Sequence, residues 1–430
     1  MEQTAADRAY SAPLAFGMAV SMWAVAYVCR LPVVMAPAWL VFALLLVAVA
    51  WWGAATGRWT GRGWSAGARV GLGAAVLNLL ILGSLLTSRE SGPLLPSALI
   101  WIPGSMLVVA GVAAAAAAVG SRDPAAGGGR NWTALFAKVA MIATFLMVIA
   151  GGLVTSFEAG LAVVDWPNTF GSNMFLYPLS RMTGGIYYEH AHRLFGALVG
   201  LTTIGLAVRL WRFDGRQWLR RLAVLAVLLV VVQGVLGGLR VTGSFTLSTS
   251  EADMAPSIVL AVLHGVLGQV FFGMMVFIAV AASSWWADAP APMPSASVAT
   301  DRTLQLGLIA VLVVQLVLGA IQRHTAQALI VHISLATVVV VMAIAAGARA
   351  WGLYVGGHPV DRLGRWLMTV VAVQVALGIA ALAVTQGRAV VGSPTTLEVT
   401  IATAHQATGA FLLALSVALA AWTRRLYRPE

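Results

Sequence analysis

Residues 326–349 read AQALIVHISLATVVVVMAIAAGAR, an apolar run of 24 residues with one histidine, His332, in its first third. As an α-helix this run would be about 36 Å long, enough to cross the roughly 30 Å hydrocarbon core of a bilayer. Similar runs recur along the whole chain. Twelve membrane spans are predicted, near residues 13–31, 35–53, 68–87, 97–120, 133–156, 188–210, 219–240, 257–284, 303–322, 326–349, 364–386 and 396–423.

The composition agrees with a membrane protein. Of the 430 residues, 60% are hydrophobic and 10% are charged, whereas a soluble domain is about 25% charged. Lipid admits helices and closed barrels, and the alternating segments of a barrel are missing from the sequence. The predicted fold class is therefore an all-α polytopic membrane protein. The single cysteine, Cys29, excludes an internal disulfide and a multi-cysteine metal site.

The basic residues predict how the chain is oriented. The net charge of +11 is dispersed over short loops between the spans, which argues against nucleic acid as a partner. Basic residues of membrane proteins gather in cytoplasmic loops. Of the 26 basic residues, 19 fall on the side of the two termini, and the other side holds Arg30, Arg89, Arg181, Arg193, Arg240, Arg323 and Arg388. We therefore predict a protein of a bacterial-type inner membrane, surrounded by lipid, with both termini in the cytoplasm.

Two polar segments divide the chain. Residues 121–131 are rich in glycine, and residues 284–301 are rich in proline, alanine and serine, so both are predicted to be linkers. They separate an N-terminal four-span region, residues 1–130, from two further four-span regions, residues 131–285 and 300–430.

Four histidines occur in paired register inside the spans. His192 and His264 are 72 residues apart, and His332 and His405 are 73 apart. With the predicted orientation, all four lie in the outer part of the bilayer at a similar depth. A neutral imidazole in a helix bundle is a common axial ligand of haem iron. A single histidine is usually a core or interface residue, but this register predicts two haem sites in two related halves.

The two halves share more than histidines. Gln233-Gly-Val-Leu-Gly237 matches Gln374-Val-Ala-Leu-Gly378, and Gln315-Leu-Val-Leu-Gly319 is a third copy. His264 and His405 are each followed four residues later by glycine, Gly268 and Gly409, on the same helix face. Such a glycine would admit a flat macrocycle or a neighbouring helix, although glycine is common in membrane helices. We predict an internal repeat of two pseudo-symmetric four-helix bundles.

The two halves differ at one position that suggests a catalytic residue in the first half. Glu189 precedes His192 by three residues, whereas the matching position of the second half is Leu329. A carboxylate at this depth is expensive and suggests a functional site, although an ordinary ion pair with Arg193 or Arg181 would explain it too. The first half also has a long outer loop, about 157–187. We expect the first half to react and the second to deliver or accept electrons.

Three further residues are weaker candidates. Arg240 and Arg323 lie at outer ends of spans, where they could hold haem propionates or reach lipid head groups. Trp166 lies in the long loop and suits either an interfacial belt or a lid over a flat apolar ligand.

The sequence resembles the haem A synthase family over about residues 133–425. The matching motifs are Gly151-Gly-Leu-Val-Thr-Ser, the loop sequence AGLAVVDWP at 159–167, Tyr-Glu189-His-Ala-His192-Arg, Gln233-Gly-Val-Leu-Gly-Gly-Leu-Arg-Val241, and the single histidines at 264, 332 and 405. Residues 1–130 lie outside the resemblance, and the paired cysteines that some members carry in the first outer loop are missing.

The resemblance implies an oxidoreductase that converts the C8 methyl of its substrate, haem O, to a formyl group, giving haem A for terminal oxidases. His192 and His264 would ligate the substrate haem, with Trp166 in the loop beside them, and Glu189 would be the essential acid. His332 and His405 would ligate a haem b cofactor. Haem O synthase, terminal oxidase subunits and further copies of the chain would be candidate partners.

Two other classes of function fit parts of the sequence. A dihaem cytochrome that transfers electrons without modifying haem explains the four histidines, but not Glu189 or the one-sided loop. A transporter explains internal repeats, but transporters usually place their polar groups at the midplane on broken helices.

Overall fold

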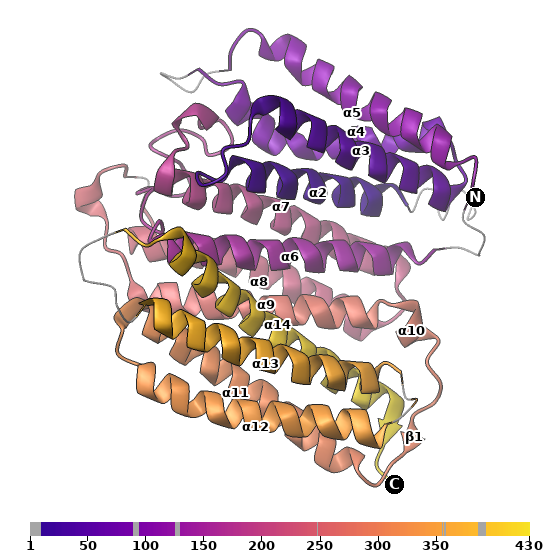
Figure 1. Ribbon diagram of the computed structural model, residues 1–430. Coiled ribbons are helices and arrows are strands. Elements are labelled where there is room, and N and C mark those ends of the chain that lie inside the picture. The colour runs from indigo at the N-terminus through magenta and orange to yellow at the C-terminus, as the bar shows by residue number, and fades with distance from the viewer. Residues whose placement is uncertain are drawn as a thin grey trace. The chain divides into compact units, whose positions relative to one another are not determined.

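The computed structural model describes residues 10–88, 94–124, 130–246, 248–354, 356, 358–385 and 393–430. Twelve helices in this part of the chain are long and apolar enough to cross a membrane, which confirms the predicted class of fold (Figure 1). They are α2 (Ser11–Arg30), α3 (Ala38–Thr60), α4 (Trp64–Leu85), α5 (Ala98–Gly120), α6 (Trp132–Ser156), α7 (Gly184–Phe213), α8 (Gln217–Thr242), α9 (Ile258–Ala281), α11 (Val298–Thr325), α12 (Leu329–Leu353), α13 (Val360–Thr385) and α14 (Thr396–Leu426).

The remaining elements are short. They are the 3-10 turns η1 (Leu179–Arg181) and η2 (Glu251–Asp253), the helix α10 (Ser284–Ala287), and the strands β1 (Met293–Pro294) and β2 (Tyr427–Arg428). Of the basic residues that predict the orientation, Arg8, Arg89 and Arg388 lie outside the described residues, as do residues 125–129 of the first predicted linker.

Several helices are longer than predicted, and α3 and α11 show local reasons. The helix α3 continues past residue 53 to Thr60 and ends at Gly61, whose φ of +64° is a left-handed conformation that glycine adopts easily. The helix α11 begins at Val298 instead of 303, although its first turns carry Asp301. That carboxylate is buried and accepts hydrogen bonds from Arg349 Nε and from the Tyr354 hydroxyl at 2.6 Å, so the charge does not end the helix.

The chain forms two compact units. The first comprises residues 1–147, 159–216 and 246–254. Within it, small residues bring helices together: a Cβ added at Gly53 or at Gly71 would lie 2.6 or 2.8 Å from a backbone oxygen of α5, that of Ala113 or Val109. Close approach at glycine and alanine is the usual way in which membrane helices pack. It explains why the N-terminal helices α3, α4 and α5 cluster.

The N-terminal helix α2 packs directly on α7. Tyr187 Oη donates a hydrogen bond to the carbonyl of Tyr27 at 2.8 Å, and the two phenol rings stack with centroids 5.9 Å apart. Trp23 and Tyr27 both meet Phe195 edge-on, at 5.8 and 5.7 Å. Aromatic pairs of this kind are worth about 0.5–1.5 kcal/mol each beyond the area that they bury. The first unit therefore fastens an N-terminal helix to the helix that carries Glu189 and His192.

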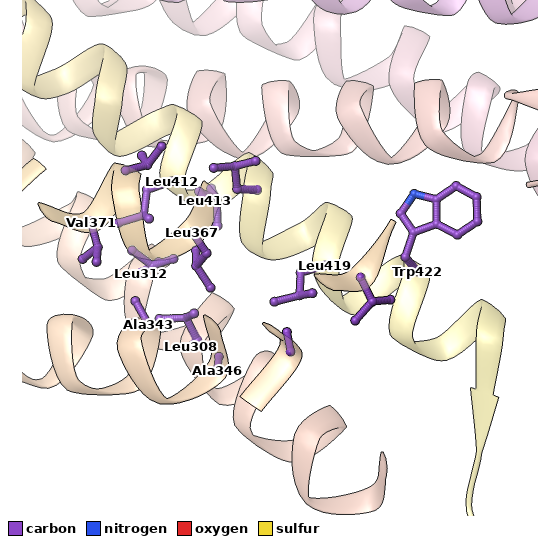
Figure 2. Close-up of a cluster of buried hydrophobic side chains, with 14 of the residues drawn as sticks. Leu308, Leu312, Ala343, Ala346, Leu367, Val371, Leu412, Leu413, Leu419 and Trp422 are labelled. Carbon is purple, nitrogen blue, oxygen red and sulfur yellow. The ribbon is translucent and has the colours of Figure 1, made fainter. Parts of the chain in front are cut away.

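The second unit comprises residues 148–158, 217–245 and 255–430 and contains a four-helix bundle. In it α11, α12, α13 and α14 pack in sequence order, and α14 also packs on α11. Figure 2 shows side chains from all four helices meeting in one core, among them Leu312, Ala343, Leu367 and Leu412. The predicted division of the chain into regions 1–130, 131–285 and 300–430, and the pseudo-symmetry of the last two, stay predictions.

The segment 284–301 is more ordered than a linker. It contains α10 and β1, and β1 pairs in parallel with β2, joining Met293 to Tyr427 and Pro294 to Arg428. Arg425 of α14 donates to the carbonyls of Trp286, Ala289 and Pro290 at 3.2, 2.7 and 2.9 Å. The guanidinium of Arg425 thus holds the backbone of this segment on the end of α14.

Candidate functional site

His332 of α12 and His405 of α14 face each other in the second unit. Their ring centroids are 6.4 Å apart and the ring planes are inclined by 76°. An imidazole nitrogen binds a metal at about 2.0–2.1 Å and lies about 1.1 Å from its ring centre, so two rings on one iron have centroids about 6.3 Å apart. The observed separation fits one metal ion held between the two rings.

The described residues supply two imidazoles and no third ligand to such an ion. Among the described residues no group of three or more His, Cys, Asp or Glu side chains is placed to hold a metal. Two imidazoles supply two of the six positions around an octahedral iron, and a porphyrin supplies the four in its plane. The two-histidine geometry is therefore better suited to haem than to a free metal ion.

Glycine makes room for each ring on the neighbouring helix. A Cβ added at Gly319 of α11 would lie 3.1 Å from Cε1 of His332, and one at Gly378 of α13 would lie 3.1 Å from Cε1 of His405. The same contact recurs between Gly237 of α8 and Cε1 of His264 in α9, again at 3.1 Å. Each glycine ends a Gln-x-x-Leu-Gly motif, so this motif lodges a histidine of the next helix.

The glycines after the histidines have a different neighbour. The Cβ position of Gly409 lies 3.2 Å from Nε2 of Gln374, and that of Gly268 lies 3.5 Å from Nε2 of Gln233. Of the two alternatives open from sequence, close approach of a neighbouring helix is therefore the one that these contacts favour.

The second predicted histidine pair is divided between the two units. His192 lies in α7 of the first unit and His264 in α9 of the second, so their joint binding of one haem stays a prediction. His264 has Gln233 and Gly237 beside it. One turn after His192, the Cβ position of Gly196 lies 3.2 Å from Cε of Met147.

Glu189 fastens the long loop to α7. It is 2% exposed; its Oε2 accepts a hydrogen bond from the backbone N–H of Val163 at 2.9 Å, and its Oε1 accepts one from Arg193 at 2.8 Å. The ion pair with Arg193, one of the two ordinary partners considered from sequence, is therefore present. Both carboxylate oxygens are engaged in holding the loop in this state.

Arg193 extends the same network. Its guanidinium donates to the carbonyls of Asp165, Asn168 and Val163 at 2.6, 3.0 and 3.0 Å, in addition to Glu189. A planar group with five N–H donors suits such a set of carbonyls, and an ammonium could not reproduce it. Arg193, one residue after His192, thus holds the middle of the loop against α7.

Asp165 and His190 hold the loop further along. Asp165 is 1% exposed and accepts from the backbone N–H groups of Phe170 and Gly171 at 2.7 and 2.8 Å. His190, which the sequence left without a role, is fully buried, with Nδ1 3.0 Å from Oγ1 of Thr169. The ring of Tyr177 lies 5.2 Å from it, and burial raises the pKa of that phenol.

The weaker candidates take less definite positions. Arg323 donates to the carbonyl of Thr155 at 2.6 Å, and the charges of Arg323 and Arg240 both act on His324, so the two arginines and His324 form a basic cluster within the second unit. Trp166 is half-buried in the loop and precedes a cis Pro167.

Sequence reasoning missed Asp165 and Thr169 as members of the network. Asp165 is part of the loop motif, but its partners are backbone N–H groups five and six residues later. A pattern of side chains does not predict such hydrogen bonds. Sequence reasoning also missed Gln315 as a neighbour of His332, because such contacts depend on which helices adjoin.

Comparison with known proteins points to one family. Residues 134–332 match the family model COX15-CtaA, described as cytochrome oxidase assembly protein. A haem A synthase of Halalkalibacterium halodurans is 30% identical over 123 residues, which cover 28% of this chain and 39% of the relative. One of Lysinibacillus sphaericus is 31% identical over 113 residues, covering 26% and 34%.

A third relative carries a different name. A protoheme IX farnesyltransferase of Haloarcula marismortui is 28% identical over 140 residues, which cover 33% of this chain and 27% of the relative. The chain thus spans about a third of the length of the curated relatives it matches. The matched family segment includes Glu189, His192, His264 and His332, and it ends before His405.

Proposed function

We propose that this chain, which matches the haem A synthase family through residues 134–332, oxidises the C8 methyl group of haem O to a formyl group. With the oxygen atom counted as coming from water, converting CH3 to CHO releases four protons and four electrons, which an external electron acceptor has to take up. This oxidation needs a site that holds the porphyrin edge still, keeps bulk water out and offers a path for protons and electrons.

The observation that carries the proposal is the loop fastened beside His192. Between α6 and α7 lie residues 157–183, whereas only residues 326–328 separate α11 from α12. Glu189, His190 and Arg193, which surround His192 in sequence, all bind this loop. A buried ion pair and several backbone hydrogen bonds make it a shaped cover. An electron-transfer cytochrome would have no use for such a cover on one histidine alone.

The histidines divide into a substrate pair and a cofactor pair. His192 and His264 would ligate haem O, because the loop and the carboxylate adjoin His192. His332 and His405 would hold haem b, since their separation fits a single iron and they lie in a compact bundle. Haem b, when bound, supplies a one-electron relay. The residues around it fix the two imidazoles and exclude water.

Glu189 is the proposed catalytic acid–base residue, and its contacts set a condition on that role. In the observed state Oε1 pairs with Arg193 and Oε2 accepts from Val163. To take a proton from the substrate edge, the carboxylate would release the Val163 N–H while Arg193 holds its other oxygen. Motion of the loop would then accompany entry of the substrate, as lids often do.

The weaker candidates complete the proposed site. Arg240 and Arg323 would bind haem propionates through charge-assisted hydrogen bonds. Trp166 would lie against the flat face of the substrate from within the loop.

The setting follows from the same proposal. Haem A would go to terminal oxidases, and the supplier of haem O would be an enzyme that attaches a farnesyl group to protohaem, the activity for which the third relative is named. The twelve apolar helices indicate an integral membrane protein. We propose that it resides in a bacterial inner membrane with both termini in the cytoplasm and the haem sites toward the outer face.

Analysis of bound pigment tests the function. The full chain is co-expressed with a source of haem O, and the haems extracted from the purified protein are identified by mass. Hydroxylated or formyl haem is expected. Recovery of unaltered haem O in a protein that binds haem would contradict the proposal and favour a dihaem cytochrome.

A further inference from the structure

Three glutamines occupy equivalent places beside histidines, and Gln315 has the most complete set of contacts. Its Nε2 donates to the backbone carbonyl of His332 at 2.9 Å and lies 3.1 Å from Nδ1 of the same residue. Gln233 likewise donates to the carbonyl of His264, at 3.2 Å. Both glutamines begin a Gln-x-x-Leu-Gly motif whose glycine lodges the ring.

We propose that Gln315 is a positioning residue that fixes the orientation of the His332 imidazole, and thereby tunes the haem at His332 and His405. This inference rests on the proposed function, because it takes His332 to be an iron ligand. It adds a role for a side chain that does not touch the iron.

The contacts of Gln315 tie the His332 ring to its own backbone and to α11. The amide Nε2 donates to the His332 carbonyl and lies 3.1 and 3.4 Å from the two ring nitrogens, Nδ1 and Nε2. An outer-shell partner of this kind fixes the orientation of a ligating imidazole and tunes the metal that it binds. Gln315 is therefore placed to set the plane of the His332 ring.

The first unit shows that a non-polar side chain can fill the same kind of space. Beside Gly268 and Gly409 stand the amides of Gln233 and Gln374, whereas beside Gly196 stands the thioether of Met147. Methionine and glutamine are both unbranched and similar in length. Gln315→Met should therefore preserve the bundle while removing the side-chain amide.

Gln305 provides a matched control on the same helix. It is also buried in α11 and donates from Nε2 to Thr423 Oγ1 of α14 at 3.1 Å, and neither His332 nor His405 is among its partners. Gln305→Met thus removes a buried amide of the same bundle without touching a proposed ligand.

The test compares the full-length holoprotein with both variants. The midpoint potential of the haem is titrated, and the electron paramagnetic resonance spectrum of the oxidised protein is recorded. We expect Gln315→Met to shift the potential and to change the g-values, because the amide no longer holds the plane of the imidazole. Gln305→Met should leave both as in the wild type. Loss of haem from a helical, monodisperse Gln315→Met protein would also support the role.

An unchanged potential and spectrum in Gln315→Met, or equal changes in the two variants, would overturn the inference. A wild-type protein without any bis-imidazole signal would instead refute haem binding at His332 and His405, which is a failure of the proposed function and is visible before any variant is made.

Discussion

Glu189 illustrates what the sequence can and cannot predict about a single residue. An acid near a histidine on an apolar helix is unusual enough to be noticed, and Arg193 is a partner that helical spacing offers. The contacts with Val163, and those of Arg193 with three loop carbonyls, depend on how the loop folds back over α7. Because the partners are backbone groups, any sequence could have supplied them.

The residue-scale prediction is that Glu189→Gln retains haem but lowers formation of oxidised haem at least tenfold. The amide can still accept from Val163, but it cannot serve as a base or neutralise Arg193, and the buried contact should weaken by about 1–3 kcal/mol. Extracted haems are quantified by mass for the variant and the wild type.

The variant Asp165→Asn is the control that distinguishes a catalytic role of Glu189 from a role in anchoring the loop. This carboxylate is equally buried and binds only loop N–H groups. If Glu189 acts on the substrate, Asp165→Asn should lose much less activity for a similar increase in hydrogen exchange of the loop. Equal losses in the two variants would show that Glu189 acts through the loop alone.

At the scale of the element, apolar runs predict membrane helices well because lipid demands about 20 apolar residues. The errors are at helix ends such as Thr60 and Val298. There a glycine in the left-handed conformation, or a buried ion pair, determines the residue at which the helix ends or begins. The Gln-x-x-Leu-Gly motifs are visible in the sequence, but their contact with a histidine of the next helix is tertiary. The position of the segment 284–301 likewise depends on a tertiary contact, because Arg425, which binds its backbone, is far away in sequence.

The element-scale prediction concerns Gly237 of α8. Alanine there would place Cβ 3.1 Å from Cε1 of His264, so the ring has to shift. Overpacking of this kind typically costs about 1–3 kcal/mol, more than alanine gains over glycine in a helix. We expect Gly237→Ala to weaken binding of haem O severalfold in a spectroscopic titration.

Gly234, three residues earlier on the same helix, is the control, because a Cβ there meets nothing within 4 Å. Gly234→Ala should bind haem O as the wild type does. Wild-type affinity in Gly237→Ala would mean that the glycine is not needed to lodge His264.

At the scale of the whole molecule, composition is sufficient to predict a polytopic helical protein. It does not predict that an N-terminal helix, α2, packs on α7 through Trp23, Tyr27 and Phe195. Aromatic residues suit lipid, interfaces and helix contacts equally, so a sequence cannot assign their neighbours. The two compact units also divide α6 within its length, at a place without any break in its apolar pattern.

The charge asymmetry gives a prediction for orientation. If both termini lie in the cytoplasm, a C-terminal fusion after Glu430 should be fluorescent with green fluorescent protein and inactive with alkaline phosphatase. A phosphatase inserted in the loop between α6 and α7 should be active. The reverse pattern would place the loop and Glu189 on the cytoplasmic side.

The most direct test of haem binding is the electron paramagnetic resonance spectrum of the purified, oxidised protein beside that of His332→Ala. The wild type should give low-spin signals of bis-imidazole haem, because two rings 6.4 Å apart suit one iron. His332→Ala should lose the signal of one haem and retain that of a haem at His192 and His264. An undiminished spectrum in His332→Ala, or the loss of every haem signal, would contradict the assignment of separate cofactor and substrate sites.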